Sequence, residues 1–258
     1  MAIISVKFMA FLAIISLLYF VMPKKIKWIV LLLGSYIYYF LSSSKLTIFL
    51  IITTISIYVS ALLINNIDNK TKIKCNGQEK SVKKQLKKKA AKNKKVVLIL
   101  TIILNFGILA FLKYGNFISE NISKLLNAIN ISYEIPLRKI VLPLGISYYT
   151  LQAISYVVDV YRGKYKAEKN FGKVALFLSF FPQMLEGPIG KFDELADQLY
   201  KPHEFDYTRV KFAAQLMLWG IFKKMVIADR AALYVNEVFS KYTEYSGIVI
   251  ILAVILYT

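Results

Sequence analysis

The sequence is poor in the residues that most often bind metals or carry catalysis. Its 258 residues contain one cysteine, Cys75, and one histidine, His203. A single cysteine excludes a disulfide framework, and without a cluster of histidines and cysteines we expect no metal site. His203 lies in the charged run KPHEFD, where we interpret it as a surface residue rather than a general base.

Acidic residues are also scarce. Fifteen aspartates and glutamates stand against 34 lysines and arginines, which gives a formal net charge of +19. In a soluble protein this excess would indicate nucleic-acid binding. Here 57% of the residues are hydrophobic and the mean hydropathy is +0.52, which is typical of a multi-pass membrane protein. We therefore expect a lipid bilayer, and no nucleic acid, as a partner.

Five apolar stretches are predicted to span the membrane. They are Ala2–Met22, Trp28–Leu41, Leu46–Ile64, Val96–Leu112 and Ile140–Tyr161. A helix needs roughly 20 residues to cross the hydrocarbon core, so the second and fourth stretches must borrow flanking residues. The predicted fold class is all-α, as a polytopic helical membrane protein.

Lysine-rich and lysine-poor connections alternate between these stretches. Twelve lysines lie between Asn65 and Lys95, and further basic residues follow the first and fifth stretches, whereas the alternate connections carry less positive charge. The positive-inside rule then predicts a multi-pass cell-membrane protein with an extracytoplasmic N-terminus and a basic cytoplasmic loop at 65–95. We interpret Lys80–Lys95 as a solvated helix or a disordered loop near anionic headgroups.

Polar and helix-disturbing residues interrupt the apolar runs between Pro143 and Lys191. The candidates for lining a substrate tunnel are Gln152, Asp159, Arg162, Gln183, Glu186, Gly187 and Pro188. In lipid, a polar group costs free energy unless it is paired or faces a water-filled cavity. Prolines and a glycine lower helicity within Val174–Gly190, so we predict a broken or re-entrant helical segment there, with Phe181–Lys191 beside a wet cavity.

Each of these candidates also has a structural interpretation. Asp159 and Arg162 are one helical turn apart, and we interpret them first as an ion pair and alternatively as a wall of a substrate opening. Gln152 is predicted to form an interhelical hydrogen bond, as is Gln183. Glu186 fits either a structural pair with a lysine such as Lys191 or a tunnel wall.

The C-terminal third contains weaker helix patterns. Lys191–Tyr200 is predicted as a short amphipathic helix because its apolar residues follow the spacing i, i+3, i+4, i+7. Asp206 is predicted to cap a helix that runs through Ala228 and is interrupted at Lys223-Lys224. Gly247–Thr258 is interpreted as the start of a further span.

Four blocks occur in an order that resembles the alginate O-acetyltransferase branch of the membrane-bound O-acyltransferase family. They are FLKYGNF at 111–117, LPLGISYYTLQAISYVVDVYRG at 142–163, FFPQMLEGPIGKF at 180–192 and LWGIFKKMVIADR at 218–230. The family's catalytic histidine lies downstream, after runs resembling DFSGYS and RRWH, and neither run occurs here. The resemblance therefore implies that residues 1–258 are the N-terminal part of such a transmembrane domain and contain no catalytic residue.

The resemblance also implies an activity. An acetyl group would pass from a cytoplasmic thioester, such as acetyl-CoA, to an extracytoplasmic polysaccharide, with a separate extracytoplasmic acetyltransferase as partner protein. No bound cofactor is implied, and we expect this chain alone to be an inactive fragment. A non-enzymatic remnant or split subunit stays an alternative, as does a multi-pass transporter, although the sequence shows no internal repeat between its halves.

Overall fold

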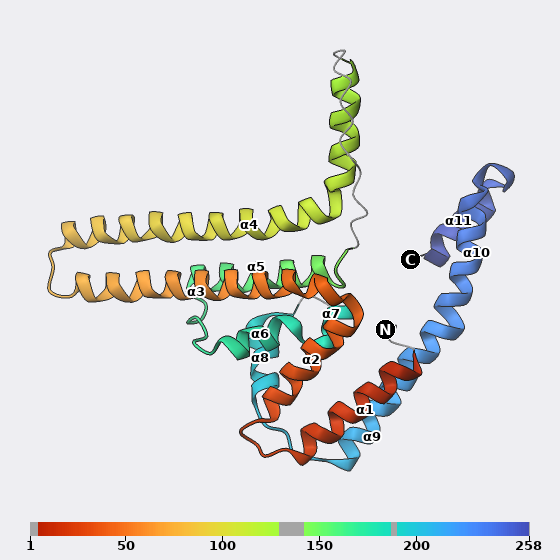
Figure 1. Cartoon of the computed structure of the whole chain (residues 1–258), viewed down its shortest axis with the longest axis horizontal. Helices are drawn as coiled ribbons and strands as arrows, with labels where there is room; N and C mark the ends of the chain where they lie inside the picture. Colours follow the sequence, from red (N-terminus) through yellow and green to blue (C-terminus); the bar gives the residue numbers. More distant parts are fainter. Residues whose placement is uncertain (1–4, 129–141, 187–189, 258) are drawn as a thin grey trace. The chain divides into compact units, whose positions relative to one another are not determined.

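The computed structural model of the chain describes residues 5–128, 142–186 and 190–257. Most of these residues lie in helices, and no strand occurs among them (Figure 1). The all-α prediction is thereby confirmed for the described residues. They divide into two compact units, the first ending at His203 and the second beginning at Glu204.

The first unit begins with two apolar helices and a long helical hairpin. Its helices are α1 (Val6–Val21), α2 (Lys27–Ser43), α3 (Thr47–Cys75), α4 (Lys80–Ala128), α5 (Ile146–Arg162), α6 (Phe171–Ser179), α7 (Phe181–Glu186) and α8 (Phe192–Tyr200). A short 3-10 turn, η1 (Ser44–Leu46), joins α2 to α3.

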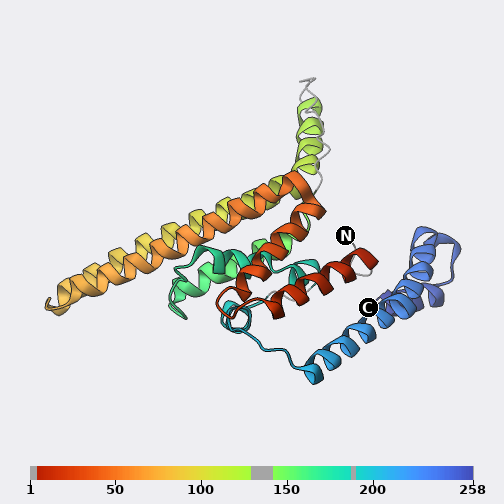
Figure 2. The same cartoon turned by 60° about the horizontal axis from the view of Figure 1, so that its bottom comes forward.

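The hairpin of α3 and α4 is longer than the apolar stretches within it. The two helices run side by side, with their connection at the tip between Cys75 and Lys80 (Figures 1 and 2). With a rise of 1.5 Å per residue, α3 continues for about 16 Å beyond Ile64, where the predicted third span ends. Residues 65–95 are thus mostly helical, which is one of the two conformations expected for Lys80–Lys95.

Short polar side chains join α3 to α4 within the apolar part of the hairpin. The Asn105 side-chain amide donates to Ser56 Oγ at 2.9 Å, and the Thr101 and Ser60 hydroxyl groups bond at 2.7 Å. Between lipid-embedded helices, where apolar contact gives little net driving force, such bonds and close packing hold the pair together. They fix the register of the hairpin.

Two helical segments are long and apolar enough to cross a membrane, Lys27–Cys75 and Lys80–Leu126. The other apolar helices, α1 and α11 (Gly247–Tyr257), are shorter, with 16 and 11 residues. Membrane insertion of these segments fits the predicted class, and the number of crossings stays a prediction.

Two aromatic clusters hold α5 to α8 in place. Phe181 of α7 packs against Phe8 of α1 and Tyr38 of α2, with ring centroids 6.1 and 5.6 Å away. Phe192 of α8 lies 4.6 Å from Tyr156 of α5, by ring centroids, and 5.0 Å from Phe177 of α6. The short helices α6, α7 and α8 are therefore anchored by large buried side chains rather than by their own length.

The second unit is a chain of consecutive helices. It contains α9 (Tyr207–Phe222), a π-helical stretch η2 (Lys223–Ala228), α10 (Asp229–Ser240), a 3-10 turn η3 (Tyr242–Glu244) and α11. Asp206 caps α9, because its carboxylate accepts from the backbone N–H groups of Thr208 and Arg209 at 2.9 and 3.2 Å. The cap agrees with the prediction, and the π-helical stretch begins at Lys223, where the interruption was predicted, but the helical run continues past Ala228 into α10.

Candidate functional site

The region predicted to carry function centres on the break between α6 and α7. These two helices end and begin around Phe180, whose backbone angles of φ −53° and ψ 105° are not helical. The predicted break in the helical segment over 174–190 thus occurs, at Phe180, two residues before Pro182. Its position relative to a bilayer stays a prediction.

Side chains from neighbouring helices bond the backbone groups that this break exposes. Gln152 of α5 donates from Nε2 to the Phe177 carbonyl at 3.0 Å, and both partners are buried. Ser35 of α2 accepts from the Phe181 backbone N–H at 3.3 Å. Without such partners, each of these buried groups would cost about 1–3 kcal/mol. Protein groups, not only water, therefore stabilise the break.

Gly145 lets α7 approach the start of α5. It precedes α5 with a φ of +66°, and a Cβ at this position would lie 2.6 Å from the Met184 carbonyl oxygen. Glycine is therefore needed twice, for the left-handed backbone and for the close contact. Met184 is 4% exposed and packs with Tyr39 and Tyr149 in one cluster.

The polar groups beside this contact were not predicted from the sequence. Tyr39 and Tyr149 are buried with their ring centroids 6.4 Å apart, and neither hydroxyl oxygen has a hydrogen-bond partner among the described residues. Ser43 Oγ accepts from the Leu144 backbone N–H at 3.2 Å. The available signal was the spacing of Ser35, Tyr39 and Ser43, which places them four residues apart on one face of α2.

The structure describes only some of the remaining tunnel candidates around the break. Gln183 is half-buried, and a Cβ at Gly190 would collide with its side-chain amide. Gly187 and Pro188 lie outside the described residues, as does the side chain of Glu186. Lys191, the expected partner of Glu186, forms an ion pair with Glu194 at 3.3 Å.

A cavity of about 370 Å³ lies against the break, on the side of α1 and α8. Its volume is within the range of small-molecule sites, roughly 300–1,000 Å³. The lining is mainly apolar and includes Leu12, Ile15, Tyr19, Phe180, Phe181, Pro182, Leu199 and His203. Phe181 and Pro182, at the start of the predicted tunnel segment, therefore border a cavity.

His203 is held at the rim of this cavity by its backbone. Its N–H donates to the Tyr19 hydroxyl at 3.1 Å, and its carbonyl accepts from Lys27 Nζ at 2.8 Å. The ring Nε2 lies 2.9 Å from the Gln198 carbonyl. Each contact of His203 fixes the chain after α8, which agrees with a structural interpretation of this residue.

Asp159 lies at the end of α5 in a different arrangement from the one expected. Among the described residues, its carboxylate contacts the Tyr165 hydroxyl at 3.2 Å and Lys164 Nζ at 3.8 Å. The predicted ion pair with Arg162 is therefore wrong for this part of the chain, because the turn after Gly163 brings Lys164 and Tyr165 back over Asp159. Burial, and then the Asp159 charge, raise the pKa of Tyr165.

Lys164 extends this arrangement to α8. Its Nζ lies 2.6 Å from Asp193, a contact that raises the pKa of Lys164 and lowers the pKa of Asp193. Both side chains are solvent-accessible, so the pair contributes modestly to stability. This network joins the end of α5 and the turn after it to the start of α8, and we call it the clasp.

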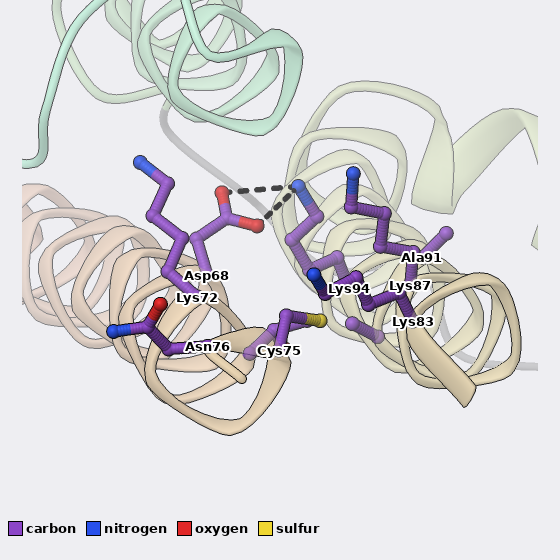
Figure 3. Close-up of a pocket in the computed structure, with 10 residues that line it drawn as sticks. Asp68, Lys72, Cys75, Asn76, Lys83, Lys87, Ala91 and Lys94 are labelled. Carbon is purple, nitrogen blue, oxygen red and sulfur yellow. Dashed lines mark hydrogen bonds and ion pairs between the residues drawn. The ribbon is translucent and has the colours of Figure 1, made fainter. Parts of the chain in front are cut away.

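A second cavity opens between α3 and α4 near the tip of the hairpin (Figure 3). It measures about 550 Å³ and is lined by Asp68, Thr71, Lys72, Cys75, Asn76, Lys83, Lys87, Ala90, Ala91 and Lys94. Asp68 and Lys94 form an ion pair across it at 2.8 Å. We call this cavity the lysine cleft.

The described residues contain no group of three or more histidine, cysteine, aspartate or glutamate side chains that could hold a metal ion. The described side-chain bonds at the break come from hydroxyl and amide groups, Ser35 and Gln152. Such groups position and enclose a substrate more readily than they move protons at neutral pH.

Comparison with known proteins gives relatives of one kind. The chain is 34% identical to a probable alginate O-acetylase of Pseudomonas syringae over 152 residues, 58% of this chain and 29% of that protein. It is 33% identical over 153 residues to the probable alginate O-acetylase of Pseudomonas aeruginosa, covering 58% of this chain and 28% of that protein. A peptidoglycan O-acetyltransferase of Helicobacter pylori is 29% identical over 181 residues, 60% of this chain and 33% of that protein.

These matches confirm the predicted resemblance to the alginate O-acetyltransferase branch of the membrane-bound O-acyltransferase family. The matched segment spans about 30% of the length of these curated relatives. No family model and no solved structure matches the chain.

Proposed function

We propose that this chain, as a member of the membrane-bound O-acyltransferase family, forms part of a membrane O-acetyltransferase. The observation that carries the proposal is its 34% identity over 152 residues to an alginate O-acetylase. The structure adds an all-helical fold in which the helix break of the resembling block FFPQMLEGPIGKF is held by specific side-chain bonds.

In this proposal, the break between α6 and α7 forms a wall of the path taken by the acyl group. Phe181 and Pro182 border the 370 Å³ cavity, and the path continues along 183–188, with Gln183, Glu186, Gly187 and Pro188 as wall residues. Gln152 acts as a positioning residue, because its amide holds the end of α6. Asp159 and Arg162 lie at the end of α5 where a donor from the cytoplasm would enter.

The donor in this proposal is a cytoplasmic acyl thioester such as acetyl-CoA, and the acceptor is an extracytoplasmic polysaccharide. A separate extracytoplasmic acetyltransferase completes the transfer. The chain spans the cell membrane several times, with its N-terminus extracytoplasmic and residues 65–95 cytoplasmic. The acetyl group must pass from one side to the other through protein, since the ionised thioester that carries it is excluded from hydrocarbon.

The test is genetic and chemical. The gene is deleted in its own organism, and ester-linked acetyl groups on cell-surface polysaccharides are released with mild base and counted. We expect the count to fall in the deletion strain and to return with the wild-type gene. An unchanged acetyl content would contradict the proposal and favour the non-enzymatic alternative.

The chain by itself is expected to lack this activity, because His203 is its only histidine and is held by backbone contacts. Purified chain in detergent, given radiolabelled acetyl-CoA and a polysaccharide, should transfer no label above a blank without protein. Transfer that disappears in His203→Ala would overturn this expectation and assign a catalytic role to the rim of the cavity.

A further inference from the structure

Lysines from both helices line the lysine cleft, with Lys83 and Lys94 half-buried and Lys72 and Lys87 exposed. Lys83, Lys87 and Lys94 recur on α4 at spacings of four and seven residues, which is the pattern of one helix face. Together with the buried Ala90, this face turns toward α3 and lines the cleft. A face that contacts a partner helix gains stability from apolar packing, so lysines at these positions need another explanation.

Charge within the cleft is unbalanced. Four lysines line it, and the single lining carboxylate, Asp68, bonds Lys94 at 2.8 Å (Figure 3). No carboxylate among the described residues forms an ion pair with Lys72, Lys83 or Lys87. Like charges on facing helices repel one another, and a bound anion would convert this repulsion into attraction.

The shape of the cleft leaves room for such an anion. Thr71 of α3 and Ala90 and Ala91 of α4 contribute short side chains to the lining, and the volume is about 550 Å³. Asn76 adds a neutral amide donor, whereas the Thr71 hydroxyl already donates to the Ile67 carbonyl at 2.6 Å. A cavity with several ammonium groups and a neutral amide donor suits the oxygens of a phosphate group, which lysine contacts as a point charge.

The level of the cleft along the hairpin bears on where the phosphate could come from. Its α3 residues lie four to eleven positions beyond Ile64, about 6–17 Å past the end of the apolar stretch. That distance covers the headgroup layer and the first layers of water. A lipid phosphate and a soluble phosphate ester can both reach this level.

We infer that the lysine cleft is a binding site for a phosphate-bearing anion, with Lys72, Lys83 and Lys87 as its charged contacts. Asp68 holds Lys94 and thereby keeps α3 and α4 at a fixed separation. The inference does not depend on the acetyltransferase proposal, because it uses only the charge and shape of the hairpin.

Anion binding can be followed through the reactivity of the Cys75 thiol, since Cys75 lines the cleft and is the only cysteine of the sequence. The rate at which Cys75 reacts with N-ethylmaleimide, a neutral reagent, is measured on the whole chain in a neutral detergent while pyrophosphate is added. In a second arm the chain is placed in nanodiscs of phosphatidylcholine alone or with phosphatidylglycerol. Cys75→Ser reports any labelling elsewhere.

The expected result is saturable protection of Cys75. Labelling should slow roughly tenfold when the anion is present at ten times its dissociation constant. Protection by pyrophosphate in detergent shows that the cleft binds a soluble phosphate group, whereas protection only by phosphatidylglycerol assigns a lipid headgroup. Labelling that stays constant in both arms overturns the inference.

A matched pair of variants separates the cleft from diffuse charge. Lys83→Gln/Lys87→Gln removes two cleft lysines, and Lys80→Gln/Lys84→Gln removes two lysines with the same spacing on the same helix that do not line the cleft. We expect protection to disappear in the first variant and to stay within about twofold of the wild type in the second, because attraction to distant charges is screened by salt. Equal loss in both variants would assign the effect to net charge and contradict a site.

Discussion

The side-chain amide of Gln152 on α5 donates to the Phe177 carbonyl of α6 at 3.0 Å, in a buried position. This carbonyl lies four residues before Phe181, whose N–H instead bonds Ser35. The helix break therefore exchanges one backbone bond for two bonds to side chains. Gln152 was predicted to form an interhelical hydrogen bond, and that prediction is confirmed.

Gln152→Leu should destabilise the first unit. The substitution keeps a similar size but leaves the Phe177 carbonyl buried without its donor, which costs about 1–3 kcal/mol. The free energy of unfolding in detergent, measured by denaturant titration, checks this. Gln198→Leu on the exposed face of α8 is the control and should change stability by less than about 0.5 kcal/mol. A loss no larger than that of the control would show that the bond contributes nothing.

Gly145→Ala should destabilise the contact between α5 and α7. The new Cβ would lie 2.6 Å from the Met184 carbonyl oxygen, so α7 must move. Gly163→Ala is the matched control, because Gly163 has a φ of +75° but open space around its Cβ position. Both variants pay the cost of a left-handed alanine, about 1–2 kcal/mol.

The difference in unfolding free energy between these two variants measures the cost of the close contact with the Met184 carbonyl oxygen. We expect Gly145→Ala to lose at least about 1 kcal/mol more than Gly163→Ala, which is the usual lower cost of overpacking. Equal losses in unfolding free energy would mean that α7 accommodates the methyl group freely.

Several parts of this arrangement follow from local sequence patterns. The apolar spacing in Lys191–Tyr200 predicted α8, with Ala196 and Leu199 buried, and Asp206 predicted the cap of α9. Such features depend on a few neighbouring residues, so a single sequence contains them. The same is true of the break before Pro182, since proline removes a backbone donor.

Other parts depend on contacts that no local pattern contains. Hydropathy predicted that the third span ends at Ile64, yet α3 continues to Cys75, because lysine is a good helix former and charge does not end a helix. Ser35 was missed because a serine in an apolar helix commonly bonds the carbonyl one turn back, as Ser35 also does to Leu31 at 2.7 Å. Its second role depends on where α7 packs.

The Lys164–Asp193 pair should make the stability of the protein depend on pH. Stability should be highest over a plateau and should fall along an acid limb and an alkaline limb. The pKa of Asp193 is lowered from 3.8 by Lys164, so its contribution is present above that value and is lost as the pH falls through the folded pKa. The pKa of Lys164 is raised from 10.5, so its contribution is present below that value and is lost as the pH rises through the folded pKa. The raised pKa of Tyr165 adds to the alkaline limb in the same direction.

Thermal unfolding in detergent across pH 3–11 measures these limbs. In Asp193→Asn, the loss of stability at acid pH should become smaller. The loss at alkaline pH should also become smaller, and the part that remains is due to Tyr165. Asp197→Asn on the same helix removes an exposed pair with Lys201 at 3.2 Å and should leave both limbs nearly unchanged. Limbs that are the same in Asp193→Asn and wild type would show that the clasp does not form in solution.

The predicted orientation places Cys75 in the cytoplasm. A membrane-impermeant thiol reagent should therefore leave Cys75 unlabelled in intact cells and label it after lysis, because the basic 65–95 segment stays on the inner side. Since Cys75 is half-buried in the lysine cleft, a cysteine at the exposed Gln78 in a Cys75→Ser background serves as a second reporter. Labelling of either position in intact cells would reverse the orientation.

Cysteine accessibility also tests whether the segment after Phe180 borders a wet path. Pro182 is exposed and lines the 370 Å³ cavity, whereas Met184, two residues on, is buried against Gly145. In a Cys75→Ser background, a cysteine at 182 should react with a small water-soluble thiol reagent much faster than one at 184. Ile103 on α4 is the lipid-facing control, because it is 62% exposed in an apolar stretch.

The three positions distinguish the possible environments of this segment. A thiol in hydrocarbon is not ionised and reacts slowly, so a cysteine at 103 should stay inert even though nothing in the protein covers it. If a cysteine at 182 reacts and cysteines at 103 and 184 do not, the exposed side of α7 faces water at membrane depth, as a path for an acyl donor requires. If the cysteine at 182 is as inert as the one at 103, that side of α7 faces lipid, and the bonds from Gln152 and Ser35 stabilise the helix break without any adjoining water-filled path.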